Sequence, residues 1–307
     1  MTNPPPAFPA RMPELISPIR TIGPRTFDFS RQVVVMAIVN RTPDSFYDRG
    51  TTFGLDAAVA AALAAAADGA EMIDIGGAPF APGPAISVAA EIDRVVPVIA
   101  AVRAASDVVI SVDTFQPEVA RASIDAGADL INDTTGLRDP GMVAVLADSS
   151  AGVVITHSLA EPRTPFARPQ YADVVAEVAD FLAGRVDAAL AAGIPADRIL
   201  IDPGHDLNKN TIHSLELTRR FGEIASLGYP ALAAVSNKDF IGETLDRERG
   251  ERLNGSIAAA VVAILNGASI LRMHNVRPAV EAARMTEAIL GFRQPAYLRH
   301  NMGEAND

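Results

Sequence analysis

Residues 107–114, DVVISVDT, form an almost wholly apolar run that reaches the carboxylate of Asp113. A run of this length, rich in valine and isoleucine, is typical of a strand buried on both faces and is too short for an ordinary helix. Pro117 and Glu118 follow, and a proline in the first turn with an acid near the positive end indicates the start of a helix. The stretch therefore predicts a parallel strand that leads into a helix.

Seven further segments repeat this pattern of a short apolar strand that ends at or near a polar residue. In three of them a Gly-Ala pair precedes the strand and ends an alanine-rich helical pattern, as glycine commonly does. Between Asn40 and His274 the repeat averages about 33 residues, close to the roughly 30 of a strand–helix–strand unit. Eight such units predict an α/β protein with a closed TIM (β/α)8 barrel. The seven segments are residues 33–39, 69–75, 127–133, 152–155, 198–201, 231–235 and 267–273.

Length and composition favour a single domain. The chain has 307 residues, of which 49% are hydrophobic and 21% charged, and one barrel needs about 250 residues. We expect the barrel over residues 32–293, a proline-rich N-terminal extension over residues 1–31 and a C-terminal tail over residues 294–307. The prolines argue against a helix or a central strand in the extension, which we expect to lie against the barrel or loose from it.

The charge and the cysteine content exclude several classes of function. A net charge of −11 without a run of Lys or Arg argues against nucleic acid or an anionic membrane as the main partner. The chain has no cysteine, so disulfides and thiol chemistry are absent. No signal peptide or membrane span is apparent, and a cytoplasmic protein is expected. A strongly apolar helix expected at residues 254–266 on the barrel exterior favours packing against another subunit.

Polar residues follow the expected strands, where a barrel of this kind builds its active site. A carboxylate there can pair with the guanidine-like edge of an amino-bearing heterocycle. Arg272 and His274 alternate along one strand and face the same way, which suits an anion such as a phosphate. Taken singly, Asp113 could cap a helix and residues 202–204 could be only a turn; placement on one rim favours function. The strand-end residues are Asn40, Asp74, Asp113, Asn132, Asp202, Lys238, Arg272 and His274.

His157 follows the fifth strand and is the least certain of the polar candidates. It could serve a site, but a hydrogen-bonded core histidine is the more common case.

Ordered motifs at these positions resemble the signature set of the dihydropteroate synthase family. They follow the family's order and span essentially residues 33–290, which makes the resemblance specific. The motifs are AIVNRTPDSF at residues 37–46, DIGG at 74–77, SVDT at 111–114, IND at 131–133, DPG at 202–204, Ser236 with Lys238, and RMHNV at 272–276.

The resemblance implies a fold, a reaction and a set of binding residues. Members of the family are TIM barrels, usually homodimers, that join 4-aminobenzoate to a dihydropterin carried as its diphosphate, with Mg²⁺. Arg272 and His274 would hold the diphosphate, and Asn40 would ligate Mg²⁺ on it. No catalytic residue is assigned, because loss of diphosphate requires stabilised charge and a held electrophile and no protein nucleophile. The residues expected to bind the pterin are Asp113, Asn132, Asp202 and Lys238.

The chain departs from the family's pattern in the loops expected over the site. Residues 78–83 read APFAPG where the family has Glu-Ser-Thr-Arg-Pro-Gly, so a flexible polar loop becomes apolar and rigid. Residues 206–209 read DLNK in place of Gly-Phe-Gly-Lys, and residues 156–160 read THSLA in place of Met-His-Met-Gln-Gly. Asn237 stands where the family has arginine. Each lost contact could cost roughly 10²- to 10³-fold in rate if it acts in the transition state.

The resemblance and the departures together predict a diverged dihydropteroate synthase paralogue. It would keep the barrel and part of the pterin diphosphate pocket, with weak or no synthase activity. Whether it is an enzyme stays open, because loops 78–81 and 205–208 leave the family's pattern. One alternative is an active dihydropteroate synthase of folate biosynthesis. Others are a methyltetrahydrofolate-type methyltransferase, since Ser236-Asn237 resembles the Ser-Asn of that group, or a non-catalytic protein that binds a pterin or an arylamine.

Overall fold

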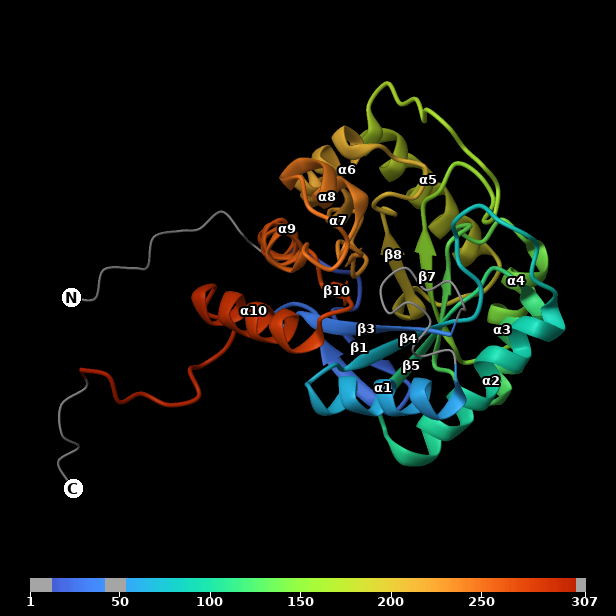
Figure 1. The fold of residues 1–307 in the computed structure, drawn as a ribbon, viewed down its shortest axis with the longest axis horizontal. Coiled ribbons are helices and arrows are strands. Elements are labelled where there is room, and N and C mark those ends of the chain that lie inside the picture. Colours follow the sequence, from blue (N-terminus) through green and yellow to red (C-terminus); the bar gives the residue numbers. More distant parts are fainter. Residues whose placement is uncertain (1–12, 42–53, 302–307) are drawn as a thin grey trace.

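Eight parallel strands close into a barrel in the computed structural model, which describes residues 13–41 and 54–301 (Figure 1). Strands β3 to β8 are successive neighbours, β10 pairs with β3, and β9 pairs with β10. Ile201 N donates to Pro230 O at 3.1 Å beside an Ile201–Ala231 bridge, which closes the ring. The predicted TIM barrel is confirmed. The strands are β3 (Val34–Asn40), β4 (Met72–Gly76), β5 (Val109–Asp113), β6 (Leu130–Asp133), β7 (Gly152–Thr156), β8 (Ile199–Asp202), β9 (Leu232–Ala233) and β10 (Ile270–Met273).

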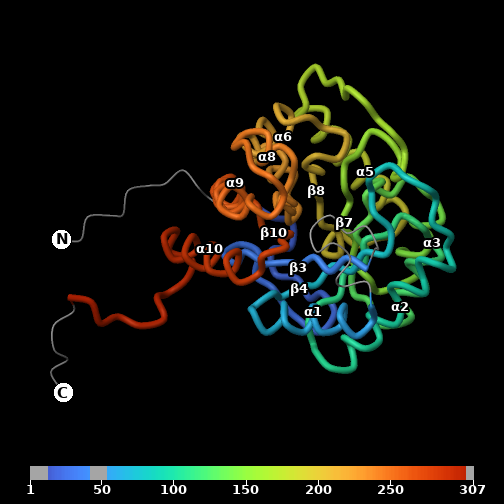
Figure 2. Tube along the Cα trace, viewed as in Figure 1, coloured from blue at the N-terminus to red at the C-terminus, as the bar shows by residue number. Residues whose placement is uncertain are grey.

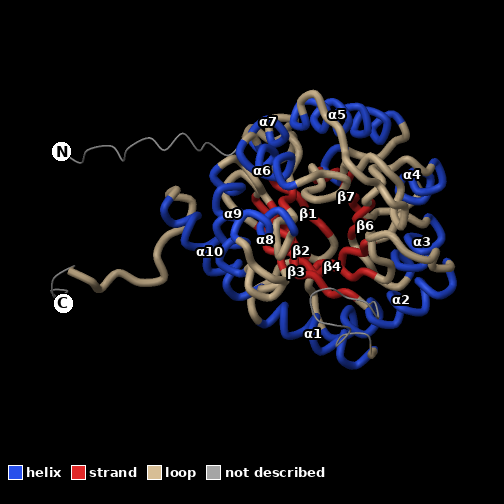
Figure 3. Tube along the Cα trace, turned by 45° about the horizontal axis from the view of Figure 1, so that its top comes forward, coloured by secondary structure: helices blue, strands red, loops and turns tan. Residues whose placement is uncertain are grey.

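A ring of helices surrounds the strands (Figure 3). Helix α10 returns from β10 and packs beside β3, so the last helix lies next to the first barrel strand (Figure 2). Helices α2 and α5 each have 18 residues. The helices are α1 (Leu55–Ala67), α2 (Val88–Ala105), α3 (Pro117–Asp125), α4 (Pro140–Ala147), α5 (Val174–Ala191), the short 3₁₀ turn Ala196–Arg198, α6 (Thr211–Arg219), α7 (Phe221–Ala225), α8 (Asp239–Leu245), α9 (Leu253–Leu265) and α10 (Val276–Ile289).

The strand pleat sorts side chains between two apolar layers. On β5, Val109 belongs to the cluster inside the barrel, whereas Ile110 and Val112 belong to the layer between strands and helices. Successive residues of a strand face opposite sides, so Ser111 and Asp113 follow Val109 on the inner face. The barrel interior is therefore apolar in its lower part and polar at the carboxyl ends of the strands.

The N-terminal extension is structured where it is described. Strands β1 (Ile19–Ile22) and β2 (Arg25–Asp28) form an antiparallel hairpin. Phe27 and Phe29 are 2% and 0% exposed and join the apolar cluster inside the barrel. The expectation of a tail lying against or loose from the barrel therefore misses a hairpin that plugs its amino-terminal end. Pro13 and Pro18 precede β1 and Pro24 lies in the turn between the two strands, so these prolines do not interrupt the hairpin.

One predicted motif falls partly outside the described residues, and the described helices can be compared with what a membrane span requires. Residues 42–46 of the motif AIVNRTPDSF lie outside the described residues. Among the described helices, none combines the length and the apolar character that crossing a bilayer requires.

Candidate functional site

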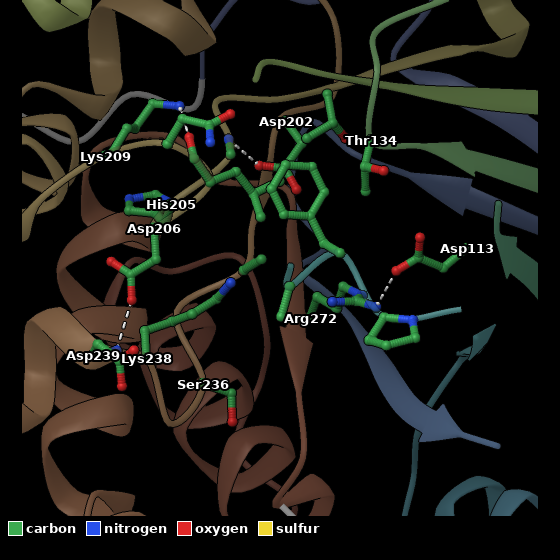
Figure 4. A pocket seen from close by; sticks show the side chains of 18 of the residues that line it. Asp113, Thr134, Asp202, His205, Asp206, Lys209, Ser236, Lys238, Asp239 and Arg272 are labelled. Carbon is green, nitrogen blue, oxygen red and sulfur yellow. Dashed lines mark hydrogen bonds and ion pairs between the residues drawn. The ribbon is translucent and has the colours of Figure 1, made fainter. Parts of the chain in front are cut away.

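A cavity of about 510 Å³ opens at the carboxyl ends of the strands. All the side chains that sequence reasoning assigned to a pterin, a diphosphate or a metal line this one cavity. Figure 4 labels four of them, Asp113, Asp202, Lys238 and Arg272. The assigned side chains reach the cavity from six strands or the residues just after them, because each takes an inner-face position above the apolar layer. The structure thus brings together Asn40, Asp113, Asn132, Asp202, Lys238, Arg272 and His274.

Arg272 occupies the centre of a buried polar network. Its Nε lies 2.6 Å from Asp74 Oδ2, and its Nη2 lies 3.0 Å from Asp113 Oδ2. Asp74, fully buried, also accepts hydrogen bonds from Ser111 Oγ at 2.6 Å and Asn132 Nδ2 at 3.1 Å. Sequence reasoning gave Arg272 to an external anion, whereas the structure shows its guanidinium already paired with two carboxylates. Asp74, recognised at a strand end but given no role, is the residue that organises this network.

Asp113 is a carboxyl group that can hold a proton near neutral pH. Burial raises the pKa of Asp113 to about 7, with Arg272 opposing the shift and the carboxylates of Asp74 and Glu91 adding to it. Its protonation state therefore changes in the physiological range. A ligand that donates or accepts a hydrogen bond here can select either form.

Asp202 and Lys238 face the cavity with unused hydrogen-bonding capacity. Asp202 Oδ1 accepts from Gly204 N at 2.6 Å, while its second oxygen has no protein hydrogen bond among the described residues. Burial raises the pKa of Asp202, with the Gly204 N–H and Lys238 opposing. Figure 4 shows the Lys238 side chain extending into the space near Arg272. Its ammonium has no hydrogen bond or ion pair in the described part of the chain, and burial lowers its pKa.

His274 and Asn40 are held at the rim by their neighbours. His274 N donates to Ser236 Oγ at 3.1 Å, and His274 Nδ1 lies 3.0 Å from the same oxygen. Asn40 ends β3 beside Gly76. A Cβ at Gly76 would lie 3.0 Å from Asn40 Oδ1, so glycine there leaves room for the amide oxygen.

His157 serves the loops around the cavity. Its Nδ1 lies 2.8 Å from Lys209 Nζ, which also donates to the carbonyl oxygens of Leu207 at 3.1 Å and His157 at 3.4 Å. Burial, reinforced by Lys209, lowers the pKa of His157 to about 2, and burial lowers the pKa of Lys209 to about 7. A neutral imidazole therefore accepts from the lysine, and the pair links the loops after β7 and β8. This contact supports the structural interpretation of His157.

Two residues that replace family glycines fasten the loop after β8. Asp206 and Asn208 have φ of +63° and +50°, a region in which Asp and Asn are tolerated better than most side chains. Asp206 Oδ2 accepts from Asp239 N at 2.6 Å, and Asn208 Oδ1 accepts from Leu159 N and Ala160 N at 3.0 and 2.9 Å. Sequence reasoning noted the replaced motif but missed this role. The sequence did contain a signal for this role, because Asp and Asn, which tolerate positive φ, stand at two positions where the family has glycine.

The loop after β4 is fastened by Arg163, a residue that sequence reasoning also missed. The Arg163 guanidinium donates to the carbonyl oxygens of Pro79, Ala81 and Pro84. Arg163 N also donates to Phe80 O at 2.9 Å. The apolar segment that departs most from the family's pattern is therefore anchored to the loop after β7.

The chain is similar to pterin-binding proteins over most of its length. The family model described as "Pterin binding enzyme" matches residues 36–274. "Inactive dihydropteroate synthase 2" of Mycobacterium leprae is 47% identical over 268 residues, covering 85% of this chain and 92% of that protein. "Dihydropteroate synthase" of Escherichia coli K12 is 41% identical over 261 residues, covering 85% and 93%.

Solved structures agree with this similarity. The Yersinia pestis dihydropteroate synthase in complex with a sulfonamide drug superposes with a TM-score of 0.85 at 37% identity, covering 90% of this chain and 100% of that one. The Xanthomonas albilineans dihydropteroate synthase in complex with 7,8-dihydropteroate superposes with a TM-score of 0.78 at 39% identity, covering 89% and 99%.

Proposed function

Because this chain belongs to the pterin-binding enzyme family, we propose that it binds a pterin at the strand ends and has weak or no dihydropteroate synthase activity. It is a diverged paralogue of the dihydropteroate synthases. Its identity to a relative named inactive is 47%, against 41% to the E. coli synthase. The observation that carries the proposal is the contrast between a complete polar set on the strands and replaced residues on the loops.

The inner cavity suits the edge of a pterin ring. The aminopyrimidinone edge presents N–H donors and a carbonyl acceptor, and ionised carboxylates pair strongly with such donors. Asp202 offers an oxygen that has no hydrogen-bond partner among the described residues. Lys238 offers an ammonium that can donate to the ring carbonyl or a ring nitrogen. Asn132, fixed to Asp74 through Nδ2, supports the carboxylate that orients Arg272. We assign Asp113, Asn132, Asp202 and Lys238 to the pterin.

The diphosphate and its metal fit the same cavity with few protein ligands. Among the described residues no cluster of three His, Cys, Asp or Glu side chains could hold a metal on its own. Mg²⁺ commonly takes one or two protein oxygens and completes its shell with substrate phosphates and water, which suits the single amide oxygen of Asn40. When bound, Mg²⁺ would neutralise charge on the departing diphosphate. Arg272 and His274 would position the phosphate oxygens.

The loops explain why synthase activity would be low. The segment over residues 78–83 has no side chain that could orient a carboxylated arylamine, and Arg163 anchors it in one position. A held electrophile without an oriented amine loses the proximity advantage that a second substrate needs. Binding of the first substrate can survive this change, because the strand residues do not depend on the loop.

A turnover assay tests this proposal. The protein would be mixed with 6-hydroxymethyl-7,8-dihydropterin diphosphate, 4-aminobenzoate and Mg²⁺, and release of diphosphate would be measured beside the E. coli enzyme. We expect no release above the blank. Turnover comparable to that of the E. coli enzyme would favour the active synthase instead. If the protein shows no turnover but its strand residues are competent, rebuilding the family loop through Ala78→Glu, Pro79→Ser, Phe80→Thr and Ala81→Arg should produce measurable turnover.

Substitution of Asp202 tests the pterin assignment separately. Asp202→Asn removes a charged acceptor, and hydrogen bonds to charged groups are worth about 1.5–3 kcal/mol, so pterin affinity should fall roughly 10- to 100-fold. Isothermal titration calorimetry with 6-hydroxymethylpterin measures this. Asp125→Asn, exposed at the end of α3, is the matched control and should bind like the wild type. Equal affinity of the two variants would contradict the assignment.

We also propose that the chain forms a homodimer through the outer faces of α9 and α10. These adjacent helices expose Val262, Met285 and Ile289 at 42%, 61% and 57%. Contiguous exposed apolar side chains favour association. Light scattering of the purified protein measures the mass directly, and a monomer at micromolar concentration would contradict the proposal.

A further inference from the structure

The cavity has two chemically different halves. The half formed by the strands carries the charged side chains described above, whereas the half formed by the loops after β4, β7 and β8 is lined mostly by apolar side chains. The loops after β4, β7 and β8 also bring polar or charged side chains to the cavity, those of Thr164, His205, Asp206, Asn208 and Lys209. Asp206, Asn208 and Lys209 are hydrogen-bonded to neighbouring protein groups. The apolar outer residues are Ala78, Pro79, Phe80, Ala81, Pro82, Phe166, Pro169 and Leu207.

Arg163 fixes this outer wall and uses its own charge to do so. Its guanidinium lies 3.3 Å from Pro79 O and 3.2 Å from Pro84 O, and it also donates to Ala81 O. Gly83 N donates back to Arg163 O at 3.4 Å. A Cβ at Gly83 would lie 2.1 Å from Arg163 Nη2, so a larger residue there would displace the guanidinium from its present position. The wall is therefore held in place, and the cation that holds it is directed at carbonyl oxygens.

Two further cations that line the cavity near this half, Lys209 and Arg249, are also engaged. Lys209 has its three donors directed at two carbonyl oxygens and His157 Nδ1. Arg249 lies 3.5 Å from Asp239. A carboxylate placed in the outer half would lose water without meeting an unpaired cation among these described side chains, which is unfavourable. An uncharged ring or alkyl group there would gain from leaving water.

From this geometry we infer that the site takes a pterin whose exocyclic substituent is neutral and apolar, such as an anilinomethyl group, in preference to one that ends in a carboxylate. The inference rests on the proposed pterin binding and names the class of ligand for the same cavity. Phe80 and Phe166 would flank the substituent, and the strand residues would hold the ring. The replaced loops thus change specificity in addition to removing synthase activity.

Three ligands separate this inference from the proposed function. 6-Hydroxymethylpterin reports the ring alone, pteroate adds an aryl group with a carboxylate, and 6-(anilinomethyl)pterin is pteroate without the carboxylate. We expect 6-(anilinomethyl)pterin to bind at least 10-fold more tightly than pteroate by isothermal titration calorimetry, and more tightly than 6-hydroxymethylpterin.

Ala81→Arg adds a cation to the outer wall and is the decisive variant. It should reduce the preference at least 10-fold or reverse it in favour of pteroate, with affinity for 6-hydroxymethylpterin unchanged. Ala191→Arg adds the same charge at the exposed C-terminal end of α5, at the opposite end of the barrel, and should leave all three affinities as in the wild type.

The outcomes point in different directions. Pteroate binding as tightly as or more tightly than 6-(anilinomethyl)pterin would overturn the inference and leave the proposed function intact, as would an aryl group that adds nothing to the ring alone. An unchanged preference in Ala81→Arg would also overturn it. Absence of binding by all three pterins would instead refute the proposed function, and this inference with it.

Discussion

Arg272 is a residue for which the structure adds ion-pair partners that the sequence did not predict. It reaches the cavity as predicted, but it donates to Asp74 and Asp113. An incoming phosphate must therefore compete with two carboxylates or share the guanidinium with them. Protonation of Asp113, whose pKa burial raises to about 7, weakens one of these ion pairs. Anion binding at Arg272 should consequently strengthen as the pH falls through neutrality.

His205 is a buried histidine with one unsatisfied nitrogen. Thr218 Oγ1 donates to Ser214 O at 2.8 Å, so it must accept from His205 Nε2, which lies 3.2 Å away. His205 Nδ1 is then an acceptor without a partner among the described residues. The ring lies between Phe221 and Phe240, with centroids 6.2 and 6.1 Å away. Burial, with Lys238 and Lys209 nearby, lowers the pKa of His205 to about 3.

His205→Phe should make the protein less sensitive to acid. The unfolded chain protonates this histidine near pH 6.5, whereas the folded chain resists protonation down to about pH 3. The unfolded state therefore binds more protons than the folded state between these pH values. As the pH is lowered through this range, the group reduces wild-type stability by about 1.4 kcal/mol per pH unit. The variant should lose that contribution. At pH 7 its unfolding free energy should match or exceed that of the wild type by about 1 kcal/mol, because an unsatisfied polar atom is removed.

Urea unfolding at several pH values, followed by circular dichroism, measures the difference between variant and wild type. Buried carboxyls with raised pKa values change stability with pH in the opposite direction. Both proteins contain them, so their contribution cancels when one pH profile is subtracted from the other. His300→Phe, on the exposed C-terminal segment, is the control and should follow the wild-type profile. Parallel pH profiles for His205→Phe and the wild type would show that His205 is not the group responsible.

At the scale of elements, the loops around the cavity are joined to one another by side chains. Asp206 links the loop after β8 to the start of α8, a helix of 7 residues that has no side-chain cap of its own. Helix α6 begins at a capping box formed by Asn210 and His213. Sequence reasoning did not predict α6 or α8, although Asn210 is a typical helix N-cap. These links make the rim a connected frame.

Asp206→Gly tests whether the link outweighs the backbone cost. Glycine would relax the positive φ, but Asp239 N and Ser214 Oγ would lose their partner. Caps of this kind are worth about 1 kcal/mol, so we expect a net loss of about 1–2 kcal/mol in unfolding free energy. Hydrogen exchange at the amides of Asp239 and Phe240 should also accelerate. A variant more stable than the wild type, with unchanged exchange at these amides, would show that backbone strain dominates.

At the scale of the whole molecule, the barrel is sealed at one end by its N-terminal hairpin and open at the other. Phe27, Phe29 and Ile22 enter the apolar cluster that the inner strand residues form. Arg20, 2% exposed, donates to Ile199 O and Ile16 O, which fastens the hairpin to β8. The hairpin is thus part of the barrel core, and only the polar end remains accessible to a ligand.

Phe29→Ala should destabilise the whole barrel. Removal of a fully buried phenylalanine typically costs about 3–5 kcal/mol, and the cavity it leaves would adjoin inner residues such as Val34 and Met36. Thermal unfolding should show one transition at a clearly lower temperature. Ile19→Ala, 65% exposed on the same hairpin, should change stability by less than about 1 kcal/mol. A near-normal melting temperature for Phe29→Ala would indicate that the hairpin folds apart from the barrel.

The sequence alone determined the barrel and the set of polar residues at one mouth, because both follow from local signals. Strand length, helix stops and the alternation of strand side chains can be read within a few residues. The tertiary structure decided which polar groups pair, how the loops are fastened and what plugs the barrel. Arg272 meets partners 198 and 159 residues away, and Arg163 anchors carbonyl groups about 80 residues away. No local pattern encodes such pairs, because they exist only once the ring has closed.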